Sequence, residues 1–444
     1  MTRRSQTVEV PSRPNTTPRT CTLRVVSSKS DRDASRPAEP STPSLLDRLG
    51  MRVARSILSQ IEIGSVQLTL PNGEQLVGGN TISEPHAELH VHDWRFFSRL
   101  LTRGDIGFGE SYTLGEWSCD HLTRLLRVII CNRRVMTNRW LQNTWFTRPL
   151  EYLFHYFSRK NTRGGSRKNI IAHYDLGNDF YAQWLDHTMM YSSAIFEHPE
   201  QTLSDAQENK IRILLDKLAL RPEHHLLEIG SGWGSVAIAA AKQFGCRVTS
   251  ITLSDEQLKF ARERVAAEGL SDRVEIVLCD YRDVTEKYDR VVSVEMLEAV
   301  GAEYLGSYFS KIDDVLKPNG VAVVQVITIA DDRYDEYRRS VDWIQRYIFP
   351  GGHLPSVGAL AHAISSHSAL VIEDLDSYAA HYAETLRRWR TTFNERWSSI
   401  TQLGFAEDFR RMWDYYLCYC EAGFETRGTN VVHLVLRRPA QNMN

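Results

Sequence analysis

The sequence is 444 residues long, which is enough for two or three domains, and 42% hydrophobic with 24% charged residues is ordinary for a globular protein. The net charge of −2 argues against a general nucleic-acid-binding protein. The seven cysteines lack C-x-x-C spacing, so the sequence predicts no metal site and no disulfide framework, and it favours a reduced, cytosolic compartment. No stretch of about 18 apolar residues is present, so any contact with a membrane is expected to be peripheral.

Residues 1–45 are rich in Ser, Thr, Pro and Arg and carry few apolar side chains. Burial of this small apolar surface cannot offset the entropy lost when the chain becomes ordered. A disordered tail is therefore predicted. The early arginines would also suit a targeting peptide, but the segment lacks an apolar h-region and contains acidic residues. The disordered tail is therefore the favoured interpretation.

A small α+β domain is predicted over residues 46–132. Apolar and polar side chains alternate at 66–70 and again at 88–92, and the Pro-Asn-Gly sequence at 71–73 favours a turn, so antiparallel strands are expected. The glycine-rich segment 104–112 is predicted to be a loop.

Basic and aromatic side chains are interleaved over residues 133–168, where nine Lys and Arg residues face a single acid, Glu151. Such a linker could rest on a membrane, because cations bind anionic headgroups and aromatic rings favour the interface. It could equally be an interdomain helix with a solvated basic face and a buried aromatic face. The composition also suits single-stranded nucleic acid, which nothing else in the sequence supports.

Residues 169–440 alternate predicted strands and helices, which indicates a doubly wound α/β domain with its ligand at the carboxyl ends of the strands. The insertion at about 330–356 is too long for a simple connection and is a candidate lid. Strands are predicted at 225–229, 247–252, 274–280, 288–294, 321–328, 369–375 and 431–437.

The first of these strands leads into Gly230, Gly232 and Gly234 and then into an Ala-rich helix. Glycines suit this turn because the chain reverses sharply and a ligand can approach the backbone closely. The G-x-G-x-G spacing, with Glu228 two residues before the first glycine, is the form seen in S-adenosylmethionine (SAM) methyltransferases. A plain strand-to-helix turn or another nucleotide site remains an alternative at this point.

A set of ordered motifs then points to a family. The sequence resembles the cyclopropane-fatty-acyl-phospholipid synthase and mycolic acid methyltransferase family over roughly residues 50–440. The resemblance implies a class I SAM methyltransferase (Rossmann-like) domain preceded by a small lipid-binding-type domain. The motifs lie at 173–181, 184–186, 190–196, 228–234, 252–254, 257, 296–298, 349–356 and 381–386.

The resemblance also implies which residues bind SAM. The three glycines would leave room for the methionyl part, and an aromatic residue would flank the adenine. The positions that match the family are Tyr191, Ser192, Glu228, Gly230, Gly232, Gly234, Thr252, Leu253, Gln257, Tyr281 and Arg282.

For catalysis the resemblance implies a bound bicarbonate as the base. Glu298, Ile327 and Tyr382 match residues that hold it, whereas Ser193 stands where the family usually has Cys and Gln325 where it usually has His. Gln can donate a hydrogen bond to an anion but cannot carry the charge of a protonated His, so the anion would be held less strongly at low pH.

The implied reaction is transfer of the SAM methyl carbon to a cis double bond in an acyl chain of a membrane phospholipid, followed by closure of a cyclopropane ring. The departures at the bicarbonate site leave a methylene- or methyl-branched product as an alternative, and a non-catalytic lipid- or SAM-binding protein as another. Alkaloid N-methylation is disfavoured by the amino-terminal segment. The resemblance further implies a cytoplasmic protein on the inner face of the membrane and suggests a homodimer, with no nucleic-acid partner.

Overall fold

The computed structural model describes residues 42–80, 84–134 and 176–440. The predicted tail at 1–45, apart from its last residues, and the basic aromatic linker at 133–168, apart from its first residues, lie outside the described part of the chain. Within the described part, no helix combines the length and the apolar character needed to cross a membrane.

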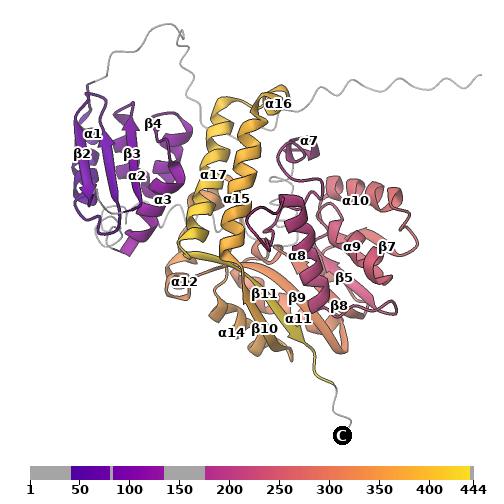
Figure 1. The fold of residues 1–444 in the computed structure, drawn as a ribbon. Helices are drawn as coiled ribbons and strands as arrows, with labels where there is room; N and C mark the ends of the chain where they lie inside the picture. Colours follow the sequence, from indigo (N-terminus) through magenta and orange to yellow (C-terminus); the bar gives the residue numbers. More distant parts are fainter. Residues whose placement is uncertain (1–41, 81–83, 135–175, 441–444) are drawn as a thin grey trace, which may run out of the picture. The chain divides into compact units, whose positions relative to one another are not determined.

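The amino-terminal segment forms a four-stranded sheet with the order β2-β1-β3-β4 (Figure 1). The turn at 71–73 joins β1 and β2 as an antiparallel pair, as expected. The pairing of β1 with β3 is parallel, so the expectation of antiparallel strands is wrong for this pair. Because β2 occupies one edge of β1, the chain must cross over to place β3 on the other edge, and it arrives in the same direction. The elements are α1 (Leu45–Leu58), β1 (Ser65–Thr69), β2 (Gln75–Gly79), β3 (His86–Val91), α2 (Arg95–Thr113), β4 (Trp117–Ser118) and α3 (Leu122–Cys131).

The loop predicted at 104–112 is helical instead. Helix α2 runs through it with a single break at Gly104, where φ is +59°. Glycine is a poor helix former, but here packing decides the conformation. A Cβ at Gly109 would lie 2.5 Å from the Trp343 ring, so this glycine allows a close approach between α2 and a later helix, α13 (Trp343–Tyr347).

The larger sheet has seven strands in the order β10-β11-β9-β8-β5-β6-β7. Strands β7, β6, β5, β8 and β9 are parallel, and β11 and β10 are antiparallel additions at one edge. All seven predicted strands are present, with shifted ends. Their bounds are β5 (His225–Ile229), β6 (Arg247–Thr252), β7 (Val274–Leu278), β8 (Tyr288–Val294), β9 (Leu316–Ile329), β10 (Val371–Ser377) and β11 (Thr429–Arg437).

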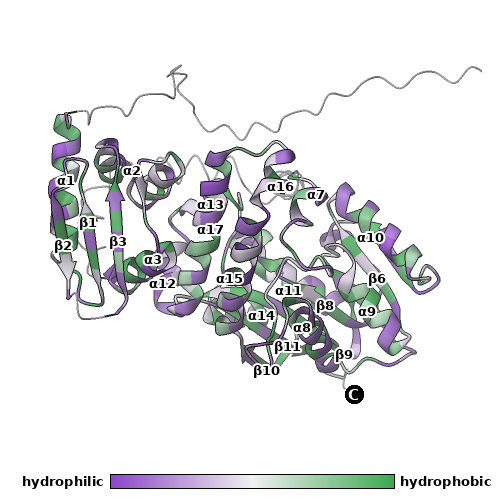
Figure 2. Ribbon diagram, turned by 45° about the horizontal axis from the view of Figure 1, so that its top comes forward, coloured by the Kyte–Doolittle hydropathy of each residue, from purple (hydrophilic) through white to green (hydrophobic). Residues whose placement is uncertain are grey.

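Helices cover both faces of this sheet, which confirms the doubly wound α/β class. Helices α8 (Leu203–Lys217), α9 (Ser235–Phe244) and α10 (Asp255–Ala267) contribute to the core on one face. Helices α11 (Leu305–Val315) and α14 (Val357–His367) contribute to the core on the other. Figure 2 shows hydrophilic and hydrophobic residues alternating along α10, as expected of a helix with one buried side. Short helical turns are α7 (Asn178–Tyr181), η1 (Tyr281–Asp283), η2 (Leu297–Ala299) and η3 (Ala302–Tyr304).

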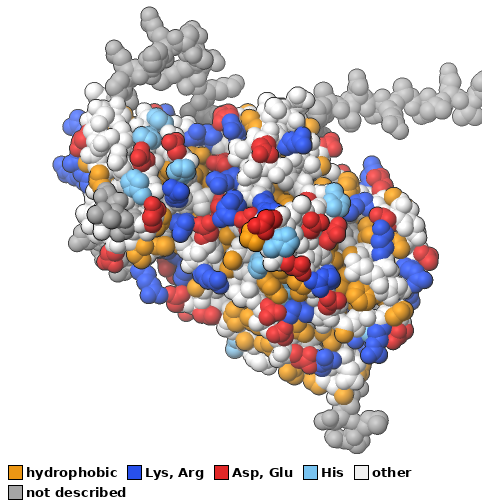
Figure 3. All heavy atoms as spheres, viewed as in Figure 1, with side chains coloured by type: hydrophobic (Ala, Val, Ile, Leu, Met, Phe, Trp, Pro, Cys, Tyr) orange, Lys and Arg blue, Asp and Glu red, His pale blue; other side chains and the backbone are white. Residues whose placement is uncertain are grey.

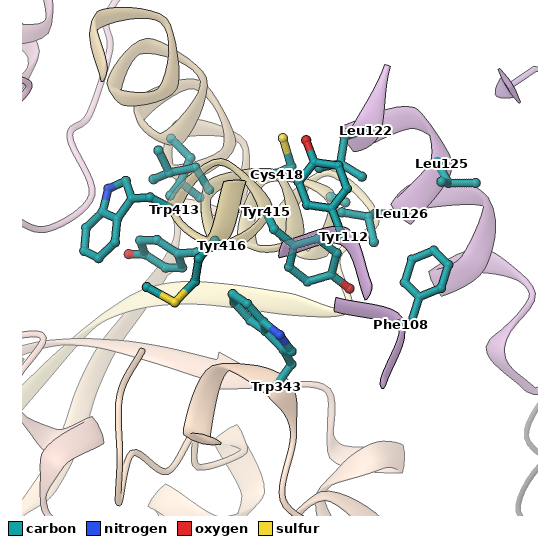
Figure 4. Close-up of a cluster of buried hydrophobic side chains, with 14 of the residues drawn as sticks. Phe108, Tyr112, Leu122, Leu125, Leu126, Trp343, Trp413, Tyr415, Tyr416 and Cys418 are labelled. Carbon is teal, nitrogen blue, oxygen red and sulfur yellow. The ribbon is translucent and has the colours of Figure 1, made fainter. Parts of the chain in front are cut away.

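The insertion at 330–356 contains α12 (Asp331–Tyr337) and α13, and the chain ends with α15 (Ala379–Glu395), α16 (Trp397–Gln402), α17 (Glu407–Glu425) and β11. Helix α17 packs against the amino-terminal segment. Arg411 donates from Nε to Tyr112 O (2.6 Å) and from a terminal nitrogen to Trp117 O (2.7 Å). Figure 4 shows aromatic side chains of α17, α13 and α2, including Tyr415, Trp343 and Tyr112, gathered in one buried cluster.

Candidate active site

The glycine turn lies at the carboxyl end of β5. All three glycines have positive φ, +96° at Gly230, +49° at Gly232 and +90° at Gly234. A Cβ at Gly234 would lie 3.2 Å from the Ala261 Cβ, so this glycine lets α9 approach α10. At Gly232 a Cβ would meet nothing within 4 Å among the described residues, so the backbone there borders open space that a ligand can enter.

Gly232→Ala is expected to weaken SAM binding by about tenfold or more, because the added methyl group enters this space and the backbone must keep a left-handed conformation. The measurement is the SAM dissociation constant by titration calorimetry. Gly269→Ala is the matched control, because Gly269 also has a positive φ (+67°) and open space beyond its Cα, but lies at the end of α10. Equal SAM affinity in both variants would contradict the assignment of the turn.

The other predicted SAM residues lie at the ends of neighbouring strands. Glu228, in β5, is 2% exposed, accepts a hydrogen bond from Ser250 Oγ (2.5 Å), and has its pKa raised to about 8 by burial. Thr252 ends β6 and donates to Gln257 Oε1 (2.9 Å), while Leu253 follows it and is partly buried.

Tyr281 follows β7 and is 8% exposed. Arg282 bonds to the carboxylate of Asp280 through two nitrogens, and its guanidinium lies over the rings of Tyr281 (5.4 Å) and Tyr304 (5.9 Å). The cofactor residues predicted at the glycine turn and after β6 and β7 are therefore gathered at one edge of the sheet.

Tyr191 and Ser192 belong to a segment that precedes the glycine turn in the chain. The Tyr191 hydroxyl bonds to that of Tyr416 (2.8 Å), and its ring lies 5.4 Å from both Trp184 and Trp389. Ser192 Oγ accepts a hydrogen bond from Lys210 Nζ (2.7 Å), and Lys210 is fully buried. The segment thus adds aromatic side chains to the site and contacts the buried Lys210 of α8.

A residue that the sequence analysis did not single out lies at the centre of the site. Glu295 directly follows β8 and has a φ of +48°, a conformation that is rare for residues other than glycine. Its Oε1 accepts hydrogen bonds from Ser193 N (2.8 Å) and Gln325 Nε2 (2.7 Å), and its Oε2 accepts one from the Tyr382 hydroxyl (2.6 Å). Three residues predicted to hold bicarbonate therefore bind a carboxylate of the chain itself.

Glu298 lies one turn further along the chain and has a different environment. Its Oε1 accepts a hydrogen bond from Ile327 N (2.5 Å), and its Oε2 is buried with no hydrogen-bond partner among the described residues. Its backbone carbonyl accepts from His353 N (2.8 Å), which ties η2 to the insertion. Of the five residues predicted for catalysis, Ile327 contacts Glu298, while Ser193, Gln325 and Tyr382 contact Glu295.

Burial and neighbouring charges affect the pKa values of Glu295 and Glu298 differently. Burial, together with the charge of Glu295, raises the pKa of Glu298 to about 8. Burial also raises the pKa of Glu295, but its three hydrogen-bond donors and the Lys210 ammonium act against that shift. The three hydrogen-bond donors favour the charged form of Glu295, whereas burial leaves Glu298 with a pKa of about 8, so the geometry favours the charge on Glu295 and the proton on Glu298.

The chain is similar to known proteins over most of its length. A family profile described as mycolic acid cyclopropane synthetase matches residues 161–434. The chain is 44% identical over 365 residues to a tuberculostearic acid methyltransferase of Mycobacterium tuberculosis, covering 80% of this chain and 84% of that protein. It is 37% identical over 361 residues to the cyclopropane-fatty-acyl-phospholipid synthase of Escherichia coli K12, covering 80% and 89%. A mycolic acid cyclopropane synthase solved in complex with SAH and CTAB superposes with a TM-score of 0.57 at 29% identity, over 61% of this chain and 98% of that one.

A seven-stranded doubly wound sheet with a glycine turn after β5 defines a class I SAM-dependent methyltransferase. Within that class, the chain belongs to the mycolic acid cyclopropane synthetase family, whose members include enzymes that modify lipids. Among the described residues there is no group of three or more His, Cys, Asp or Glu side chains arranged to hold a metal ion.

Proposed function

We propose that this protein transfers the methyl group of SAM to a cis double bond in an acyl chain of a membrane phospholipid, and that Glu295 accepts the proton that the new methyl group then loses. The observation that carries this proposal is the Glu295 carboxylate with its three hydrogen-bond donors. A base held inside a water-poor site is what the chemistry requires, since an alkene is a weak nucleophile and its methylation leaves a carbocation.

The residues at the carboxyl ends of β5, β6 and β7 fit SAM. The open space at Gly232 would admit the methionyl part, and Tyr281 with Arg282 would flank the adenine. When bound, SAM supplies an electrophilic methyl group. The chain's own contribution is to orient the acyl chain and to exclude water, for which the buried rings of Trp184 and Trp389 beside Tyr191 are suited.

Glu295 takes the place of the bicarbonate that the family resemblance implies. The backbone N–H of Ser193, the Gln325 amide and the Tyr382 hydroxyl would be the donors for such an anion, and all three already bond to Glu295. A second anion at this position would meet the charge of Glu295 instead of free donors. Turnover is therefore proposed to be independent of added bicarbonate.

For the product, we propose a methylene-branched chain. After methylation a hydride moves from the methylated carbon to the neighbouring cationic carbon, which leaves the charge on the methylated carbon. Loss of a proton from the new methyl to Glu295 then forms a C=CH₂ (methylene) group on the chain. Support comes from the relative at 44% identity, which is named as a methyltransferase of a fatty acid, and from Gln325 at the position where the cyclopropane synthases usually have His.

A cyclopropane ring is the second candidate, supported by the family profile and by the synthase relative at 37% identity. It follows from the same cation without the hydride shift. The electron pair of the broken methyl C–H bond joins the methyl carbon to the cationic carbon, and the proton again goes to the base.

Helix α1 supports a peripheral contact with lipid. Leu45, Leu46 and Leu49 are 84%, 54% and 47% exposed, and Arg48 and Arg52 are exposed beside them. Apolar side chains flanked by cations suit the surface of an anionic membrane. On the rest of the face drawn in Figure 3, basic and acidic side chains are interspersed.

The test is mass spectrometry of lipids after incubation of the full chain with SAM and vesicles of cis-unsaturated phospholipids, with and without bicarbonate. We expect acyl chains that gain one CH₂ and keep a double bond that hydrogenation reduces, with faster turnover on anionic vesicles. The same gain resistant to hydrogenation would establish the ring. No gain, with measurable SAM binding, would contradict the proposed substrate.

A further inference from the structure

Gln325 and His433 face each other across the antiparallel strands β9 and β11. Their Cα atoms are direct partners in the ladder, so both side chains project from the same face of the sheet. Each residue is 1% exposed, and His433 Nε2 lies 2.9 Å from Gln325 Oε1. The other end of the Gln325 amide lies 2.7 Å from Glu295 Oε1.

The direction of these hydrogen bonds follows from their partners. An ionised carboxylate can only accept, so the amide nitrogen of Gln325 faces Glu295 and the amide oxygen faces His433. The oxygen can only accept in turn, so His433 carries its proton on Nε2. A Gln325 amide turned by 180° would place two oxygens 2.7 Å apart and would remove a donor from Glu295.

We propose that His433 is a positioning residue of the active site, which holds the Gln325 amide in the orientation that donates to Glu295. This inference rests on the proposed role of Glu295 as the base. The Glu295 carboxylate and the Ser193 carbonyl (3.5 Å) favour this orientation from the nitrogen side of the amide, and the Nε2–H of His433 stabilises it from the oxygen side.

His433 is suited to this role because it stays neutral. Its Nδ1 is buried and has no hydrogen-bond partner among the described residues, so a proton there would be unpaired. The surrounding groups are Lys210 and Lys217 from α8, Asp374 from β10, and the Tyr378 ring at 4.6 Å. Burial and the two lysines lower the pKa of His433 to about 3, with Asp374 acting weakly in the opposite direction.

The test is a double-mutant cycle with His433→Leu and Gln325→Leu, measuring kcat against pH. His433→Leu is expected to lower kcat by about tenfold and to move the acid limb of the profile to higher pH, because Glu295 loses a donor that favours its ionised form. In the Gln325→Leu background, His433→Leu should lower kcat by less than about twofold, since His433 acts only through Gln325. Equal losses in both backgrounds, or an unmoved acid limb, would overturn the proposal.

A second readout does not depend on catalysis. Ring ¹³C shifts of histidine-labelled full chain, with the His433 signal assigned by its loss in His433→Leu, should report a neutral Nε2–H ring from about pH 5 to about pH 8. The Gln325→Leu variant should lose this single tautomer. If His433 titrates in that range or carries its proton on Nδ1, the inference fails. If the tautomer is as expected but Glu295→Gln retains activity, the hydrogen-bond chain stands and the base assignment fails instead.

Discussion

Glu295→Gln is expected to lower kcat by about 10²–10⁴-fold, the range usual for loss of a general base. Gln keeps the size of the side chain but cannot accept the proton from the new methyl group. SAM affinity should stay within about threefold, because the contacts of Glu295 are to Ser193, Gln325 and Tyr382 and not to the glycine turn. Single-turnover measurements on vesicles, with calorimetric titration of SAM, separate the two quantities.

Glu298→Gln is the matched control for this experiment. Since the pKa of Glu298 is about 8, its side chain is protonated at neutral pH, and an amide resembles that state. The loss of kcat is therefore expected to be about tenfold or less. A larger loss in Glu298→Gln than in Glu295→Gln would contradict the assignment of Glu295 as the base and would favour Glu298, which the family resemblance implies as a residue that holds the base.

Much of the fold follows from local patterns in the sequence. Strands β5, β6, β7, β8 and β9 contain short apolar runs bounded by polar or glycine-rich segments, and their parallel order follows from the helical segments between successive strands. The antiparallel pairing of β11 with β9 and β10 does not follow from this alternation. The helical course of 104–112 could not be predicted in this way. Gly107 lets the second half of α2 approach the Arg99 backbone in the first half across the break at Gly104, and Gly109 permits close packing against the distant Trp343. Contacts of this kind leave no periodic pattern in the sequence.

Some residues of the candidate site likewise follow from local sequence patterns, and others do not. Gly230, Gly232 and Gly234 form a local motif, so the position of the glycine turn at the carboxyl edge of the sheet was predictable. Glu295 is a single acid after an apolar strand, which is a signal for the carboxyl edge of a sheet, but the motif match drew attention to Glu298 three residues later. Lys210 and His433 carry no local signal, because only the assembly of α8 and β11 beside β9 brings them to the site.

Lys210→Met is expected to lower kcat by up to about tenfold near pH 6.5, because each unit added to the pKa of Glu295 lowers the fraction ionised by up to tenfold once that pKa exceeds the pH. Lys210 is fully buried, and its ammonium is the cation that counters burial of the Glu295 carboxylate. Without that charge the carboxylate binds a proton more readily and ceases to act as a base. The measurement is kcat against pH on vesicles, with SAM affinity determined in parallel.

The pH dependence of this effect has a definite sign. Burial lowers the pKa of Lys210 from its usual 10.5 to about 7, while Glu295, Asp186 and Glu228 act to raise it. The wild-type lysine is therefore charged below about pH 7 and largely neutral above about pH 8, so the difference between Lys210→Met and wild type should be largest at low pH and shrink as the pH rises. Ser192→Ala is the control, because it removes the hydrogen bond of Lys210 but leaves the charge. A constant ratio across the pH range, or an equal effect of Ser192→Ala, would mean that the hydrogen bond and not the buried charge is what the site requires.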